Sequence, residues 1–176
     1  MRLLPGLAVA LALAAASPAA AMTLDSQDIK PGDVIAPLHV YTRCGGGNVS
    51  PQLSWTAPPA RAEALVLTMI DMDVKPHLWS HWIVEGLPPI AATMPRGFKD
   101  LPAGAHGVVS NFGEARYDGP CPPPGSGVHR YQLTIWAMPT ANVAIAPNEK
   151  ADALMKRLLA TSIDHASVEG TVAARR

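Results

Sequence analysis

The sequence has no excess of charge of either sign. Its 176 residues carry 14 Lys and Arg against 14 Asp and Glu, and no run of like charge occurs. Proteins that bind nucleic acid usually have a clear basic excess, and electrostatic membrane binders carry clusters of Lys and Arg. The composition therefore argues against a nucleic-acid partner and against a polybasic membrane-binding patch.

Common signatures of hydrolases and zinc enzymes are also missing. The sequence has no Gly-x-Ser-x-Gly motif, which presents the nucleophilic serine of α/β-hydrolases, and no His-Glu-x-x-His motif for zinc. We therefore expect a protein that is not an enzyme and needs no metal and no cofactor. A metal site built from two histidines and a carboxylate stays open as an alternative, as does an unrecognised hydrolase.

A long apolar run occurs only at the start of the chain. Arg2 precedes the apolar stretch Leu3–Ala16, and Ser17–Ala21 ends in the small residues that signal peptidase accepts. We predict a signal peptide over residues 1–21, one domain over residues 22–176, and a periplasmic or secreted protein. An uncleaved membrane anchor is the alternative, but the run is short for a membrane span. After cleavage we expect no transmembrane segment.

Cysteine is scarce, with only Cys44 and Cys121 in the chain. In an exported protein an even number of cysteines favours a disulfide. A Cys44–Cys121 bridge would close a loop of about 80 residues and stabilise the fold by roughly 4 kcal/mol in the loop-entropy model. Two free, buried thiols are the alternative.

Short apolar or alternating stretches, separated by glycine and proline turns, make up most of the remaining sequence. One segment, Glu149–Ile163, has the apolar spacing of a helix with one buried face, and Asn148 is a good N-cap for it. Many short strands and one helix predict a mainly β fold, an antiparallel β-sandwich-like domain with a C-terminal peripheral helix. The predicted strands are Leu38–Thr42, Leu53–Thr56, Ala64–Ile70, His81–Glu85 and Arg130–Met138, with a last edge strand at Thr171–Val172.

The proline-rich loop Gly119–Gly125 is the strongest indication of a binding site. Four of its seven residues are proline, which has no amide hydrogen, so few backbone donors remain. Cys121 is the central donor of the loop, and Gly119 is a second. His129 and Tyr131 follow on one face of the next predicted strand. A stiff loop with few donors, followed by these side chains, is suited to holding a small ligand.

Polar side chains also flank two neighbouring predicted strands. Asp71 and Asp73 follow the first strand, and His81 begins the second. If the two strands pair as a hairpin, Asp71 and His81 lie at the same end of the sheet, where His129 and Tyr131 also converge. This set suits an oxyanion, and we expect the carboxylate to raise the pKa of His81 so that it donates as a cation. The alternatives are structural histidines and aspartates that cap a tight turn.

Three blocks of sequence occur in the order and at the spacing of a known family. They are Gly47–Trp55, Asp71–Asp73 followed by Trp79–Trp82, and Tyr117–Tyr131. These blocks resemble the phosphatidylethanolamine-binding proteins, in particular the bacterial branch often called Raf kinase inhibitor-like. The resemblance covers about Thr23–Val172.

The resemblance implies a β-sandwich-like fold with a small anion pocket near the surface. Ligands of the family are phosphate-like groups and the phosphoethanolamine head group of a lipid. Bacterial relatives often carry a cysteine in both the glycine-rich turn and the proline loop, which supports the predicted bridge. The family's pocket residues carry over to Asp71, Trp79, His81, Cys121 through its backbone amide, His129 and Tyr131.

The sequence departs from the family at Asp71–Pro76. The family's usual Asp-Pro-Asp-Ala-Pro is here Asp-Met-Asp-Val-Lys-Pro, so one proline is lost and Pro76 is displaced by one position. We expect Pro76 not to wall the pocket and Lys75 to add a positive charge at the rim. We expect this change to affect which ligand is preferred, and not the fold.

We predict that the protein binds a small phosphate-bearing anion or a lipid head group without catalysing a reaction. The alternative is an inhibitor or regulator of a protease or kinase that acts by protein–protein contact, since members of the family inhibit such enzymes.

Overall fold

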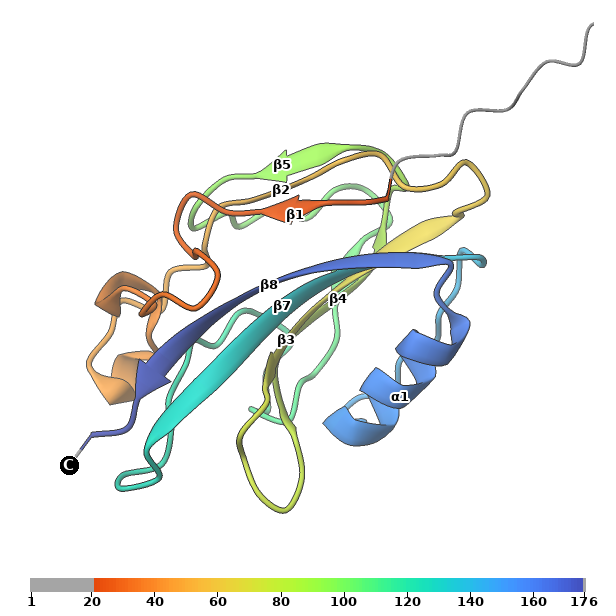
Figure 1. Ribbon diagram of the computed structural model, residues 1–176. Helices are drawn as coiled ribbons and strands as arrows, with labels where there is room; N and C mark the ends of the chain where they lie inside the picture. Colours follow the sequence, from red (N-terminus) through yellow and green to blue (C-terminus); the bar gives the residue numbers. More distant parts are fainter. Residues whose placement is uncertain (1–20, 176) are drawn as a thin grey trace, which may run out of the picture.

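The computed structural model describes residues 21–175, so the predicted signal peptide lies outside the described residues except for Ala21. The strands are β1 (Leu24–Asp25), β2 (Leu53–Trp55), β3 (Ala64–Asp71), β4 (Trp79–Leu87), β5 (Ala92–Met94), β6 (His106–Gly107), β7 (Val128–Met138) and β8 (Asp164–Ala173), and the α-helix is α1 (Ala151–Thr161). They form an antiparallel five-stranded sheet, in the order β6-β4-β3-β7-β8, and an antiparallel three-stranded sheet, in the order β1-β2-β5 (Figure 1). The predicted mainly β, sandwich-like fold with a helix near the C-terminus is confirmed.

The larger sheet is covered on both faces, which explains why β3 is an unbroken apolar run. Successive side chains of a strand point to opposite faces. Leu65 and Leu67 therefore pack into the core between the two sheets, whereas Val66 packs under α1 with Leu154 and Leu158. Figure 1 shows this layering, with the small sheet on one side of the large sheet and α1 on the other.

The predicted helix is confirmed, but it is shorter than predicted at both ends. Lys150 is the N-cap, and Asn148 adopts a left-handed conformation with φ 57° in the turn before it. The chain becomes extended again at Ser162, because Asp164, the first residue of β8, already pairs with Ala137 of β7. The apolar spacing identified the buried face, but the tertiary pairing set the ends.

The predicted strand Leu38–Thr42 is wrong. The structure has two short 3₁₀ helices, Pro37–His39 and Thr42–Cys44, and the chain then folds back on itself. The amide of Gly47 donates to the carbonyl of Pro37 over 3.0 Å. A side chain on Gly46 would collide with the carbonyl of Val40, so the turn needs glycine there. The alternating apolar residues that suggested a strand therefore belong to this compact turn.

The other predicted strands are confirmed with small differences at their ends. The predicted edge strand at Thr171–Val172 is part of the much longer β8, which lies at one edge of the large sheet. The sequence pattern missed β1, β5 and β6 because two or three residues are too few to show a period.

The end of β8 is fastened to the proline loop. The amide of Gly125 donates to the carbonyl of Arg175 over 3.0 Å, and Ala174 donates to the carbonyl of Gly127 over 2.6 Å. Cys44 and Cys121 lie with their Cα atoms 5.6 Å apart, paired as a disulfide requires. The proline loop is thus held at both ends by segments distant in the sequence.

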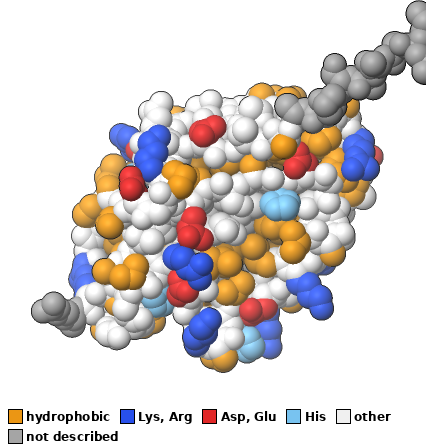
Figure 2. Space-filling model, viewed as in Figure 1, with side chains coloured by type: hydrophobic (Ala, Val, Ile, Leu, Met, Phe, Trp, Pro, Cys, Tyr) orange, Lys and Arg blue, Asp and Glu red, His pale blue; other side chains and the backbone are white. Residues whose placement is uncertain are grey.

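None of the helices within residues 21–175 is both long enough and apolar enough to span a membrane. On the face drawn in Figure 2, basic side chains lie among acidic ones and do not gather into a patch of one sign. This arrangement agrees with the balanced composition.

Replacing both Cys44 and Cys121 by alanine should lower the free energy of unfolding by about 2–4 kcal/mol, because the bridge restricts a loop of 77 residues in the unfolded chain. Urea unfolding of the variant and of the unmodified protein, each with and without reductant, measures this. The reductant should destabilise only the unmodified protein. An unfolding midpoint that reductant leaves unchanged would exclude the bridge.

Candidate functional site

Three strand ends meet at one edge of the large sheet and place most of the predicted site residues together. Asp71 at the end of β3 pairs with Trp79 at the start of β4 and with Tyr131 near the start of β7. Beside them lies a cavity of about 270 Å³. Its lining residues are Asp71, Val74, Trp79, His81, Phe112, Cys121 and Pro123.

Asp71, which lines this cavity, forms a buried pair with His129. Both side chains are almost completely buried, and Nδ1 of His129 lies 2.8 and 3.0 Å from the two carboxylate oxygens. A carboxylate accepts hydrogen bonds, so Nδ1 carries the proton. The amide of Asp73 also donates to Asp71, over 2.9 Å. The carboxylate of Asp71 is therefore held by His129, and not by His81 as the sequence suggested.

His81 is held by the main chain of the proline loop. Its Nδ1 lies 3.0 Å from the carbonyl oxygen of Asp118 and 3.1 Å from that of Gly119. A carbonyl cannot donate, so Nδ1 carries the proton and Nε2 is an acceptor in the neutral ring. Nε2 has no hydrogen-bond partner within residues 21–175, and it is not one of the fully enclosed atoms without partners. It is therefore open to the cavity.

The predicted direction of the His81 pKa shift is wrong. Burial lowers the pKa of His81 to about 4, because the charged ring would lose its hydration. The hydrogen bond to the Asp118 carbonyl and the charge of Asp71 act in the opposite direction but are weaker. His81 is therefore a neutral acceptor at pH 7, and not a charged donor.

Tyr131 carries a buried hydroxyl with no partner in good hydrogen-bonding geometry within the described part of the chain. The ring packs edge-on against His81, with centroids 5.2 Å apart. Burial and the nearby charge of Asp71 raise the pKa of Tyr131, so it stays protonated. The hydroxyl is fully enclosed, and it lies next to the carboxylate of Asp71 and the amide of Cys121.

Asn48 fixes the loop that carries these groups. Its side-chain oxygen accepts a hydrogen bond from the amide of Gly119 over 2.7 Å, so this amide is not free for a ligand as the sequence had suggested. A side chain on Gly119 would collide with the carbonyl of His39, which explains the glycine. The amide of Cys121 enters no backbone–backbone hydrogen bond within residues 21–175, and it lies next to the Tyr131 hydroxyl.

Asp73 is not among the residues that line the cavity. Its carboxylate forms a two-pronged ion pair with Arg130, with atoms 2.9 and 3.0 Å apart, and also accepts the Arg130 amide over 2.8 Å. The hydrogen bond from Arg130 is the main reason that the pKa of Asp73 falls to about 2. Asp73 thus holds Asp71 through its amide and the start of β7 through its carboxylate.

The sequence analysis did not identify the apolar side chains that line the cavity. Phe112 stacks near His81, with ring centroids 4.9 Å apart, and also packs edge-on against Tyr41. One of only two phenylalanines in the chain, placed in a polar loop, was the available signal. Val74 lines the cavity and Pro76 does not, as the altered segment led us to expect. Lys75 is exposed and does not line the cavity.

Within residues 21–175, no group of three His, Cys, Asp or Glu side chains is placed to hold a metal ion. His129 faces Asp71, whereas the Nδ1 of His81 faces two carbonyls, so the two rings do not converge with a carboxylate on one point. The metal alternative has no support in this geometry.

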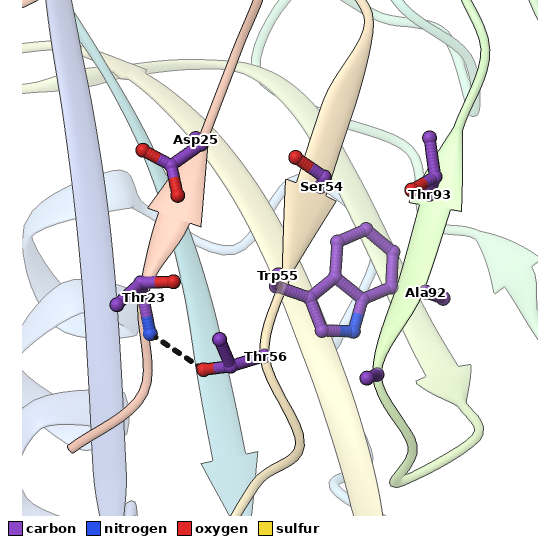
Figure 3. Close-up of a pocket in the computed structure, with 8 residues that line it drawn as sticks. Thr23, Asp25, Ser54, Trp55, Thr56, Ala92 and Thr93 are labelled. Carbon is purple, nitrogen blue, oxygen red and sulfur yellow. Dashed lines mark hydrogen bonds between the residues drawn. The ribbon is translucent and has the colours of Figure 1, made fainter. Parts of the chain in front are cut away.

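A second hollow, of about 360 Å³, lies on the small sheet and is drawn in Figure 3. Half of its eight lining residues carry a hydroxyl, and the amide of Thr23 donates to the hydroxyl of Thr56 over 2.9 Å. Of its lining residues only Asp25 is ionisable, and none is a predicted site residue. The candidate site is therefore the cavity at Asp71 and His81.

The family model described as phosphatidylethanolamine-binding protein matches residues 25–173. The chain belongs to the phosphatidylethanolamine-binding protein family. Among its relatives in this family is the UPF0098 protein YbcL of Escherichia coli (strain K12), which is 33% identical over 158 residues. That match covers 85% of this chain and 86% of YbcL.

The fold agrees with that of family members of known structure. The crystal structure of Escherichia coli YbcL superposes with a TM-score of 0.77 and 30% identity, over 89% of this chain and 99% of that one. LppC of Mycobacterium tuberculosis (strain H37Rv), which is named as a lipoprotein, is 42% identical over 106 residues. The match covers 60% of this chain and 51% of LppC, so it spans about half the length of that protein.

Replacing Tyr131 by phenylalanine should leave the free energy of unfolding unchanged or raise it by up to about 1 kcal/mol, because the hydroxyl that is removed has no partner. Tyr117→Phe is the matched control. The Tyr117 hydroxyl donates to the carbonyl of His39 over 2.7 Å, so its loss should cost about 1 kcal/mol or more. Urea unfolding measures both variants, and equal destabilisation by the two would contradict the unpaired state of Tyr131.

Replacing Asp73 by asparagine should destabilise the protein in a pH-dependent way. A carboxyl whose pKa is lower in the folded state stabilises the fold above its unfolded pKa, near 4, and this effect is lost as the pH falls towards 2. Arg130 is about half exposed, so solvent screening limits the effect to about 0.2–1 kcal/mol. The difference between variant and unmodified protein in urea unfolding should shrink from pH 6 to pH 2.5, and a constant difference would refute the ion pair's role.

Proposed function

We propose that this protein binds a small phosphate-bearing anion, such as free phosphate or a phosphoethanolamine-type head group, in the cavity at Asp71 and His81. The observation that carries the proposal is the cavity at the meeting strand ends, which Asp71, His81 and Cys121 line together. The description of the matching family model, phosphatidylethanolamine-binding protein, supports a phosphate-bearing ligand. Trp79, which is 40% exposed, is one of the residues that line the cavity.

We propose binding without a reaction. The carboxylate of Asp71 is fully engaged by His129 and the amide of Asp73, and no cysteine thiol is free within residues 21–175. A nucleophile next to a base is what covalent catalysis would need. Inhibition of a protease or kinase by protein contact is the alternative, but a cavity of about 270 Å³ favours a small ligand.

We also propose that the protein acts outside the cytoplasm, in the periplasm or as a secreted protein. The predicted signal peptide over residues 1–21, the paired Cys44 and Cys121, and the similarity to a protein named as a lipoprotein support this location.

Phosphoethanolamine or inorganic phosphate in excess should raise the melting temperature at pH 6. A ligand present at a hundred times its Kd stabilises by about 2.7 kcal/mol, which is several degrees for a domain of this size. His81→Ala should abolish the shift. His165→Ala is the matched control, because His165 stacks on Trp136, outside the residues that line the cavity.

If neither ligand shifts the melting temperature of the unmodified protein, the anion pocket is refuted. A shift of equal size in His81→Ala would move the binding site elsewhere on the molecule.

A further inference from the structure

The chain enters the core of the protein at Met22. Ala21 is exposed, whereas Met22 is only 5% exposed and belongs to the core between the two sheets. Met22 immediately follows the predicted signal peptide, residues 1–21, so it would be the first residue of the chain after cleavage. The inference drawn from this coincidence rests on the proposed export of the protein.

A carboxylate faces the nitrogen atom of Met22. This nitrogen donates a hydrogen bond to Oδ2 of Asp164 over 2.9 Å, although the two residues are 142 positions apart in the sequence. Asp164 is the first residue of β8 and is partly buried. β1, which begins two residues after Met22, and β8 lie next to each other (Figure 1). The hydrogen bond therefore joins the start of the small sheet to the edge strand of the large sheet.

Asp164 has no cationic partner among the side chains of the described residues. Within residues 21–175 no Lys, Arg or His side chain forms an ion pair with it. Its other oxygen, Oδ1, accepts the amide of His165 over 2.8 Å. Both of these partners are neutral amides, and a charge that is removed from water without a compensating charge is unfavourable. A cation on the Met22 nitrogen would lie at hydrogen-bonding distance from this carboxylate.

Cleavage by a signal peptidase would supply this cation. Hydrolysis of the peptide bond between Ala21 and Met22 consumes one water molecule. The carbonyl group of Ala21 becomes a carboxylate on the released peptide, and the nitrogen of Met22 becomes an ammonium group. The ordinary pKa of an α-amino group is about 8, so this group is charged at pH 6. The charge arises on the same atom that donates to Asp164.

We propose that the chain is cleaved between Ala21 and Met22, and that the new ammonium group of Met22 forms an ion pair with Asp164. Asp164 is thus the binding site for the N-terminus of the processed protein. A cut one residue earlier would move the charge to a residue whose Cα lies about 3.8 Å further along the chain. A cut one residue later would remove a core side chain. The processed chain is therefore more stable than the same fold with any residue in front of Met22.

The N-terminus of the exported protein is the first test. The full chain is expressed in a bacterium with a periplasm, and the protein purified from the periplasmic extract should have the intact mass of residues 22–176. A processed chain that begins at any other residue would overturn the proposal but leave the proposed export intact. A chain that stays in the cytoplasm with residues 1–21 attached would refute the export, and the cleavage with it.

Insertion of one glycine between Ala21 and Met22 moves the charge without removing the hydrogen bond. Cleavage after Ala21 then leaves the glycine in front of Met22, whose nitrogen is again a neutral amide that can donate to Asp164. Urea unfolding at pH 6 should give an unfolding equilibrium constant roughly three- to tenfold higher than that of the processed unmodified chain. The intact mass of the variant verifies the position of the cut. An unchanged equilibrium constant would contradict the ion pair.

Asp164→Asn separates the ion pair from other effects of the insertion. This substitution should destabilise the unmodified processed chain more than the glycine-insertion variant, by the same three- to tenfold factor, because only the unmodified chain has a charge beside residue 164. Asp25→Asn is the matched control, since Asp25 is an exposed carboxylate on β1, and it should have equal effects in the two chains. Equal effects of Asp164→Asn in the two chains would overturn the proposal, because the ammonium group and the carboxylate would not be coupled.

Discussion

The close approach of the proline loop to the turn at residues 39–48 is the constraint on which the site depends. Gly119 lies against the carbonyl of His39, the Tyr41 amide donates to Pro120 over 3.1 Å, and Asn48 holds the Gly119 amide. Because the loop is fixed there, its carbonyls stand where they orient His81. A segment without regular secondary structure thus acts as a rigid wall of the cavity.

Much of the fold could be predicted from the sequence because its signals were long. The run Ala64–Ile70 and the alternation in Arg130–Met138 span a whole strand each, and Glu149–Ile163 shows a clear buried face. The stretch Leu38–Thr42 misled because five alternating residues can also occur in a tight turn. Its conformation is set by Gly46 and by hydrogen bonds to residues beyond it.

The site could be predicted as a set of residues but not as a set of interactions. Spacing brought Asp71, His81 and Tyr131 to one end of the sheet. Which histidine faces the carboxylate depends on side-chain directions that no sequence pattern encodes. In the structure, the carboxylate of Asp71 accepts a hydrogen bond from His129. The pKa of His81 was misjudged because charge proximity was considered without burial, and here burial is the larger effect.

The hydrogen bonds from His81 to the carbonyls of Asp118 and Gly119 fix its ring before any ligand arrives. A side chain that has to become ordered on binding loses conformational entropy, and this loss weakens the affinity. Folding has already ordered this ring. The cavity therefore presents His81 in one orientation, and ligand capture should need little rearrangement of the protein.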